Sequence, residues 1–412
     1  MSKIVDIVGR AVFDSNGKPA VEAEVVLENG TRGRAIAPRG STTGEHEAIV
    51  LEDSQKLPSL SAATPALNVI RETIRPALNG VDGRDQAAID AALLRVDSSP
   101  RKERVGGNVS IAVSMAAAKA GAAAAGIPLH RHLANGHGGK QLPGPMFNII
   151  DGATTADSAV AGIEFLLIPS RSLPLPSALE MGVRVYGEAR RELRAKGMAV
   201  GDSAQGAVEG QLRDCEEGFD VVLAAALSAG FRVGDDFTIG VDLAAADYYD
   251  DGRYVFPWCT PAEQAWDKLI ERYERWQQVY PLTYLEDAFA ESDTPAWVEL
   301  TRRAGPTTEV IGDDLFASSP VRITEGIRER WAHGVLIKPN QIGTVTETLR
   351  SMRIAQDSGF ASMVSQRSGE NDDAFITHLA VAGGARYLKA GGMSRMDRII
   401  KFNELLRIAE YF

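Results

Sequence analysis

Residues 334–366 read GVLIKPNQIGTVTETLRSMRIAQDSGFASMVSQ, and this stretch indicates how the larger part of the chain folds. It begins and ends with GVLIKP and ASMVSQ, short apolar runs of the kind that form buried strands. Between them, a helix expected from Thr344 places Val345, Leu349 and Met352 on one face. Strands of this kind, separated by a helix, predict parallel pairing with both faces of the sheet covered.

The same alternation of apolar runs and, for the most part, helical segments continues through the chain after Pro145. The runs are MFNII, EFLLIP, FTIGVDL, LTYLED, EVIGDD, GVLIKP, ASMVSQ and RYLKAG. Eight strands in about 270 residues are typical of a TIM-type barrel. We therefore predict an α/β fold in which residues 139–412 form a (β/α)8 barrel.

The first third of the chain has a different pattern. KIVDIVGRAVFD, AVEAEVVLENG and TRGRAIAP have the composition of strands, with turn residues between them. Helical segments follow in ATPALNVIRETIRPAL, RDQAAIDAALLRV and NVSIAVSMAAAKAGAAAAG. A cluster of Gly and Pro in LANGHGGKQLPGP predicts a boundary. Residues 1–138 are therefore expected to form an N-terminal α+β domain.

Composition excludes several classes of partner. The 412 residues carry a net charge of −11 with scattered Lys and Arg, which argues against nucleic acid. An acidic chain that binds a small anionic substrate must concentrate positive charge locally or recruit a metal. Cys215 and Cys259 lie far apart, so neither a disulfide framework nor a zinc site is expected. Charged residues interrupt the opening MSKIVDIVGRAV, and we expect no membrane span there and a cytoplasmic location.

Charged residues stand at most ends of the apolar runs, where a barrel of this type carries its active site. In chain order these positions are Glu164, Asp202, Asp242, Glu286, Asp313, Lys338, Gln366 and Lys389. Glu164 alone lies at the start of its run. Any single carboxylate at such an end can simply cap a helix or bind a loop amide. Charged residues at most of these ends together indicate an active site more strongly than any one of them alone.

Asp242, Glu286 and Asp313 end three successive strands, so their carboxylates are expected to meet at one rim. Carboxylates so placed repel one another, and a divalent cation such as Mg²⁺ relieves the repulsion. Lys338 and Lys389 follow on later strands. A Lys beside a cation is pushed toward its neutral form and can act as a base, while a second Lys can hold an anion. This set suits abstraction of a proton next to a carboxylate, with metal stabilising the enediolate.

The chain resembles the enolase family along nearly its full length. The similar segments, in the expected order, are SKIVDIVGR, DSNGKPAVEAEVVLENGTRGRA, GEHEA, GDDLFASSP, LIKPNQIGT, RSGE and SRMDRIIKFNELLRI. The resemblance implies an N-terminal capping domain, an enolase-type modified (β/α)8 barrel and a Mg²⁺-dependent hydro-lyase. It also implies a homodimer or a higher homo-oligomer.

The resemblance implies a role for each of several residues. Asp242, Glu286 and Asp313 match the ligands of the first metal, and Thr42 matches the loop serine that ligates the second. Lys338 matches the base that removes the C2 proton, and Lys389 matches the lysine that binds the substrate carboxylate. Glu164 matches the acid that assists the leaving hydroxyl, and Arg367 and Ser368 match the phosphate binders. This sequence keeps all of the residues that the resemblance assigns to proton abstraction.

The departures from the family pattern cluster in the other half of the site. Ser203 stands where the family has the Glu that protonates the leaving hydroxyl. Thr155 and Gln366 replace two histidines near the phosphate. Arg39 replaces a small Ser, and Thr42 replaces the metal-binding Ser. We therefore expect the substrate pocket to be reshaped around the phosphoryl group and the leaving hydroxyl.

These changes favour a specialised paralogue that dehydrates a 2-phosphoglycerate-like acid to an enolpyruvate. Carboxyphosphonoenolpyruvate synthases, from the biosynthesis of phosphonate antibiotics, fit because a carboxylate on phosphorus would give Arg39 a partner. Arg39 could equally be a solvent-facing loop residue. The alternatives are an ordinary glycolytic enolase with an atypical site and a non-catalytic enolase-like scaffold. Glu164 and Glu209 are the candidates for the missing acid, and Asp202 lies beside the changed position.

Overall fold

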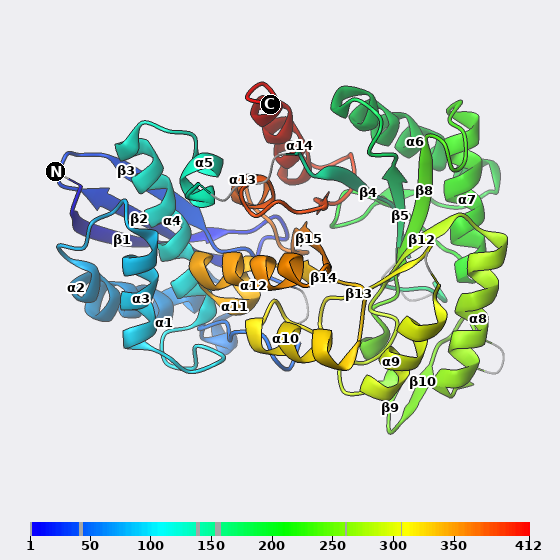
Figure 1. Ribbon diagram of the computed structural model, residues 1–412, viewed down its shortest axis with the longest axis horizontal. Coiled ribbons are helices and arrows are strands. Elements are labelled where there is room, and N and C mark those ends of the chain that lie inside the picture. Colours follow the sequence, from blue (N-terminus) through cyan, green and yellow to red (C-terminus); the bar gives the residue numbers. More distant parts are fainter. Residues whose placement is uncertain (1, 41–43, 137–140, 153–157, 260–261, 306) are drawn as a thin grey trace.

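A small antiparallel sheet with helices lies beside a larger barrel (Figure 1). The computed structural model describes residues 2–40, 44–136, 141–152, 158–259, 262–305 and 307–412. The small sheet consists of β1 (Ile4–Phe13), β2 (Pro19–Leu27) and β3 (Arg32–Ile36) in that order. Val12 pairs with Ala20 across the first turn, so the three expected strands form successive hairpins.

Helices cover one face of this sheet. They are α1 (Thr64–Val69), a π-helical turn (Ile70–Ile74), α2 (Arg75–Leu78), α3 (Gln86–Val96), α4 (Gly107–Ala125) and α5 (Leu129–Ala134). The central helix α4 packs on β2 and β3, and Gly33 permits the close approach because a Cβ there would lie 2.1 Å from Ala116 O. By length and composition alone α4 could cross a membrane, but 72% of its apolar window is buried inside the protein. It serves as the core helix of the N-terminal unit.

The larger unit is the expected barrel. Within the described residues, eight strands close on themselves through pairing of β16 with β4. These strands are β4 (Gly144–Gly152), β5 (Glu164–Pro169), β8 (Phe237–Asp242), β12 (Leu282–Glu286), β13 (Glu309–Gly312), β14 (Gly334–Ile337), β15 (Ala361–Ser365) and β16 (Tyr387–Lys389). All eight apolar runs therefore form barrel strands.

One barrel strand runs opposite to the expectation of uniformly parallel pairing. β5 is antiparallel to both of its neighbours, β4 and β8. Its first residue, Glu164, consequently lies at the same rim as the last residues of the parallel strands. This reversal explains why Glu164 begins its apolar run, whereas the other site residues follow theirs.

The segment around Asp202 was wrongly predicted to end a barrel strand. β6 (Gly201–Asp202) and β7 (Val208–Gly210) form a short hairpin beside the barrel, and β7 pairs in parallel with β4. Asp202 is exposed, and its carboxylate accepts hydrogen bonds from Tyr186 and Arg190. These contacts hold the Asp202 carboxylate at the surface. A sequence that is typical of a strand end therefore forms a surface hairpin at this position.

Helices surround the barrel and cover the outward face of its strands (Figure 1). They are α6 (Leu175–Ala195), α7 (Cys215–Ser228), α8 (Trp266–Val279), α9 (Thr294–Arg303), α10 (Pro320–Glu329), α11 (Pro339–Ile342), α12 (Val345–Asp357), α13 (Phe375–Ala382) and α14 (Met396–Ala409). A further small sheet is formed by β9 (Tyr249–Asp250), β10 (Arg253–Val255) and β11 (Glu263–Gln264).

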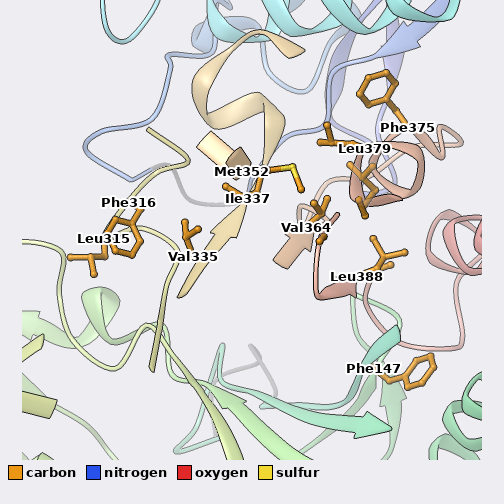
Figure 2. Packing of buried hydrophobic residues seen from close by; sticks show 14 of the residues in the cluster. Phe147, Leu315, Phe316, Val335, Ile337, Met352, Val364, Phe375, Leu379 and Leu388 are labelled. Carbon is orange, nitrogen blue, oxygen red and sulfur yellow. The ribbon is translucent and has the colours of Figure 1, made fainter. Parts of the chain in front are cut away.

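The helix that follows Thr344 packs on the barrel as its apolar spacing predicts. Thr344 caps α12 by accepting a hydrogen bond from Glu347 N at 3.2 Å. Val345 and Met352 are fully buried, and Figure 2 shows Met352 close to Ile337 on β14. α12 also contacts α3 and α4, so it links the barrel to the N-terminal unit.

Candidate active site

Five acidic residues form an in-register row across adjacent strands at one rim of the barrel. Glu209 on β7 pairs with Asp151 on β4, which pairs with Glu164 on β5. Glu164 pairs with Asp242 on β8, which pairs with Glu286 on β12. Residues paired across neighbouring strands carry side chains on the same face. Pairing alone therefore gathers these carboxyl groups at the mouth of the barrel.

Two lysines on later strands form ion pairs with carboxylates at this rim, and Lys389 does so with three members of the row. Lys389 Nζ lies 3.0 Å from Glu164, 2.9 Å from Asp242 and 2.7 Å from Glu286. Its side chain is 3% exposed, so these charges interact in a largely desolvated site. Lys338, just after β14, forms an ion pair with Asp313, just after β13. The structure thus brings together the carboxylates and lysines that were expected to abstract a proton.

Burial and nearby charges set the pKa values of these carboxylates and lysines. Burial raises the pKa of Glu286 well above its usual range, and Asp242 adds to the effect. Burial also acts to raise the pKa of Asp242, but Lys389 outweighs it and the pKa is lowered. For Lys338, burial acts to lower the pKa, but carboxylates led by Asp313 outweigh it and raise the pKa. Each ammonium is therefore held charged by its carboxylates.

The carboxylates suit a hard divalent cation. Glu286 Oε1 is buried and, among the described residues, receives no hydrogen bond. Such an oxygen is a suitable metal ligand, and Mg²⁺ prefers carboxylate oxygens. The oxygens that lie within 4.8 Å of one another belong to Asp287, Asp313 and Asp314, whereas Asp242 and Glu286 meet at Lys389. Of the expected ligands, only Asp313 belongs to the first of these groups, and its carboxylate pairs with Lys338.

Asp287 has a structural function in this group. Its two carboxyl oxygens accept hydrogen bonds from the backbone N–H groups of Asp313, at 2.8 Å, and Asp314, at 3.2 Å. These bonds fix the turn that leaves β13 and hold Asp313 at the rim. Because its oxygens serve the turn, Asp287 is a less suitable metal ligand than Asp242 or Glu286.

The N-terminal unit completes the site on its phosphate side. Arg367 is 5% exposed and donates a hydrogen bond from Nη1 to Glu47 Oε2 at 2.8 Å. Glu47, Arg367 and Ser368 all line one cavity of about 390 Å³, together with the lysines and most of the acids described above. The role of Glu47 was not predicted, because its contact with Arg367 joins positions 320 residues apart.

Amide and hydroxyl groups fill the other half of the cavity. Gln205 Nε2 donates to Glu164 Oε1, and Gln366 Nε2 donates to Gln205 Oε1. Ser203 Oγ accepts hydrogen bonds from the backbone of Gln205 and of Ala207, both at 3.2 Å. Gln205 was not predicted as a site residue, and only its place in the changed loop pointed to it.

The loop that carries Ser203 and Gln205 is firmly held. Gly392 N donates to Gln205 O at 2.8 Å, and Arg398 Nη2 donates to Ala204 O at 3.0 Å. Gly392 is needed for this approach because a Cβ there would lie 2.1 Å from Gly206 O. Arg398 is fully buried and also donates to the backbone oxygen of Arg367. Arg398 therefore fixes the altered loop to the segment of Arg367, which was predicted to bind phosphate.

Three further residues were predicted to belong to the site: Arg39, Thr42 and Thr155. Arg39 forms a two-pronged ion pair with Glu52, in which one N···O distance is 2.8 Å. Its guanidinium is thus already engaged, and its backbone pairs with Gly369 beside the site. Thr42 and Thr155 lie outside the described residues, so their roles stay predictions.

A TIM-type barrel whose rim joins these carboxylates to two lysines defines a class: barrel enzymes that abstract a proton beside a carboxylate. Comparison with known proteins makes the assignment narrower. Residues 4–133 match the enolase N-terminal domain, and residues 139–412 match the enolase C-terminal TIM barrel domain. The enolase of Acidothermus cellulolyticus is 41% identical over 410 residues, covering 100% of this chain and 95% of that protein. The chain therefore belongs to the enolase family and is a hydro-lyase.

Family membership confirms the predicted fold and reaction class. It gives no support to the specialised carboxyphosphonoenolpyruvate synthase interpretation, and the relative named enolase favours the ordinary enolase alternative.

Proposed function

We propose that the protein dehydrates 2-phosphoglycerate to phosphoenolpyruvate in a Mg²⁺-dependent reaction. The observation that carries the proposal is that Lys338 and Lys389, which line one cavity, pair with carboxylates at the rim ends of four barrel strands. The 41% identity to an enolase over the whole chain supports 2-phosphoglycerate as the substrate.

The residues of the cavity divide the work between the two ends of the substrate. Lys338 is placed to remove the C2 proton, and Lys389 to hold the substrate carboxylate. Arg367 and Ser368 are placed to bind the phosphoryl group, for which a buried guanidinium is well suited. Glu164 lies beside Lys389.

Asp242, Glu286 and Asp313 would hold Mg²⁺. When bound there, the ion would supply positive charge for the substrate carboxylate as negative charge develops on it. Lys338 must be neutral to act as a base, so it can accept the C2 proton only when Asp313 is neutralised by another partner.

A second candidate is dehydration of a related acid whose phosphorus bears a carboxylate. Ser203, Gln205 and Gln366 favour it, because neutral groups there leave a pocket that differs from the family pattern at the phosphoryl end. Arg39 gives this candidate less support than expected, since Glu52 occupies its guanidinium.

The two candidates are separated by kinetics with both substrates. Pure protein with Mg²⁺ is given 2-phosphoglycerate or its carboxyphosphono analogue, and the enolpyruvate product is followed by ultraviolet absorbance. We expect the larger kcat/KM for 2-phosphoglycerate. A larger value for the analogue would favour the second candidate, and no product or C2 exchange with either would indicate a non-catalytic scaffold.

The proposal includes a cytoplasmic location and a small anionic substrate as ligand, with neither nucleic acid nor membrane as partner. It also includes a homodimer or higher homo-oligomer, as the family resemblance implies.

A further inference from the structure

We propose that Asp151 is the general acid that protonates the leaving hydroxyl. This inference rests on the proposed function and names the proton donor that the substitution at Ser203 removed. Asp151 belongs to β4, lines the same cavity as Lys338 and is 7% exposed.

Asp151 lies directly beside the position that lacks the expected carboxyl group. The Ser203 side chain hydrogen-bonds the Asp151 carboxyl group, so the two positions are direct neighbours. A Glu at position 203 would extend its longer side chain into the space next to that serine hydroxyl. The Asp151 carboxyl group reaches the same space from β4. The acid is therefore supplied from an adjacent strand instead of the loop.

Asp151 also faces the base across the barrel. In the closed order of strands, β4 is separated from β14 by β15 and β16 on one side and by β5, β8, β12 and β13 on the other. Lys338 follows β14 directly, so the acid and the base flank the cavity. A base and an acid on different sides of the substrate suit an anti elimination, in which the C2 proton and the C3 hydroxyl leave from opposite faces.

Glu164 is a weaker candidate for the donor because one of its oxygens accepts a hydrogen bond and the other forms an ion pair. Oε1 accepts from Gln205, and Oε2 lies 3.0 Å from Lys389 Nζ. Glu209 lines the cavity from β7, on the far side of Asp151 from Glu164. Of these three acids, Asp151 has the neighbours that best fit a proton donor.

The protonation state supports the assignment that the geometry makes. Burial, followed by repulsion from Glu164, raises the pKa of Asp151 from 3.8 to about 7, against the opposing effects of Ser203, Asn148 and Arg398. A carboxyl group with a pKa near the working pH can both hold and release a proton. An ordinary Asp would be ionised and could not donate.

The proton and the bonds balance without another reactant. Lys338 takes the proton from C2, the C3–O bond breaks, and the Asp151 proton joins the departing oxygen to form water. The C2–H electron pair forms the new double bond. Lys338 is then an ammonium and Asp151 a carboxylate, and exchange of one proton with solvent restores both.

The test compares exchange and elimination in Asp151→Asn. With 2-phosphoglycerate and Mg²⁺ in deuterated water, C2 exchange should stay within about threefold, because Lys338 is intact. Formation of enolpyruvate should fall about 10²-fold or more, as expected for loss of a general acid. Asp202→Asn, which changes an exposed acid held by Arg190, should leave both rates unchanged.

A second variant tests the assignment by rescue of elimination. In Asp151→Asn with Ser203→Glu, a carboxyl group returns from the loop, and elimination should recover at least tenfold over the single variant. Full elimination by Asp151→Asn, or equal loss of exchange and elimination in it, would overturn the assignment. Absence of exchange in the unmodified protein would instead contradict the proposed function itself.

Discussion

The two halves of the barrel rim hold their polar groups in different ways. On one half, Lys338 and Lys389 neutralise carboxylates from neighbouring strands through short ion pairs. On the other half, the hydrogen bonds of Asp151 come from neutral groups, the Ser203 hydroxyl and the Asn148 amide, and the Gln205 network lies beside them. The difference shows that charge balance fixes the proton-abstracting half, whereas hydrogen-bond geometry shapes the leaving-group half. Changes of charge should therefore be far more costly on the first half.

The largest stability effect is expected for Lys389→Met. It leaves Glu164, Asp242 and Glu286 buried together without their shared ammonium, and such a loss typically costs about 3–5 kcal/mol. Denaturant unfolding without Mg²⁺ should show a loss of this size, and Mg²⁺ should recover part of it. Lys268→Met, which removes an exposed ion pair with Glu271, should change stability by less than about 0.5 kcal/mol. Equal effects of the two variants would contradict the comparison.

Binding of Mg²⁺ tests the same half without measuring activity. At about one hundred times its Kd, Mg²⁺ should stabilise the folded protein by about 2.7 kcal/mol. Calorimetry should show that Mg²⁺ raises the melting temperature of the unmodified protein and raises that of Asp242→Asn much less. Asp202→Asn serves as the control because its carboxylate lies on the surface hairpin. An unchanged response in Asp242→Asn would remove Asp242 from the ligands.

The dependence on pH tests the other half. The raised pKa of Asp151, about 7, means that elimination should fall about tenfold per pH unit above that value. The groups that face Asp151 are Glu164 on β5, Glu209 on β7 and Arg398 on α14. Elimination by Asp151→Asn should lack this alkaline decline, and stopped-flow rates across the pH range would show it. An identical profile in the variant would contradict the assignment.

The same shift affects stability with a definite sign. The folded protein binds the Asp151 proton more tightly than the unfolded chain, because the folded pKa is raised from 3.8 to about 7. Between these values, the contribution of Asp151 to stability falls as the pH rises. Denaturant unfolding of Asp151→Asn should show a shallower decline over that range, and a steeper one would be inconsistent with burial of the neutral acid.

The smallest effect is expected for Arg39. Its two-pronged pair with Glu52 is partly buried, with side-chain exposures of 17% and 14%, and its loss should cost about 1 kcal/mol. Arg39→Ala and Glu52→Gln should lower stability equally and leave KM for 2-phosphoglycerate unchanged. A tenfold rise in KM for Arg39→Ala alone would show that Arg39 binds substrate.

Much of the fold follows from the sequence because buried barrel strands form uninterrupted apolar runs. The reversal of β5 could not be predicted, since an apolar run carries no mark of its direction, and Glu164 at its start was the only sign. Asp202 was misplaced for a related reason: a short apolar run before a turn predicts a barrel strand and a surface hairpin equally well.

The site was predictable where each residue ends its own strand, as for Lys338 and Asp313. Asp151 was not, because its significance depends on its pairing with Glu164 and its contact with Ser203. Glu47 and Glu52 were missed for the same reason, since a contact across the chain leaves no local pattern.

The central claim is that this chain retains the proton-abstracting half of an enolase-family site. Exchange of the C2 proton of 2-phosphoglycerate in deuterated water with Mg²⁺, followed by NMR, tests it most directly. The unmodified protein should exchange this proton, and Lys338→Ala should lower the rate by about 10²–10⁴-fold, the typical contribution of a positioned base. Exchange that survives in Lys338→Ala, or that is absent from the unmodified protein, would contradict the claim.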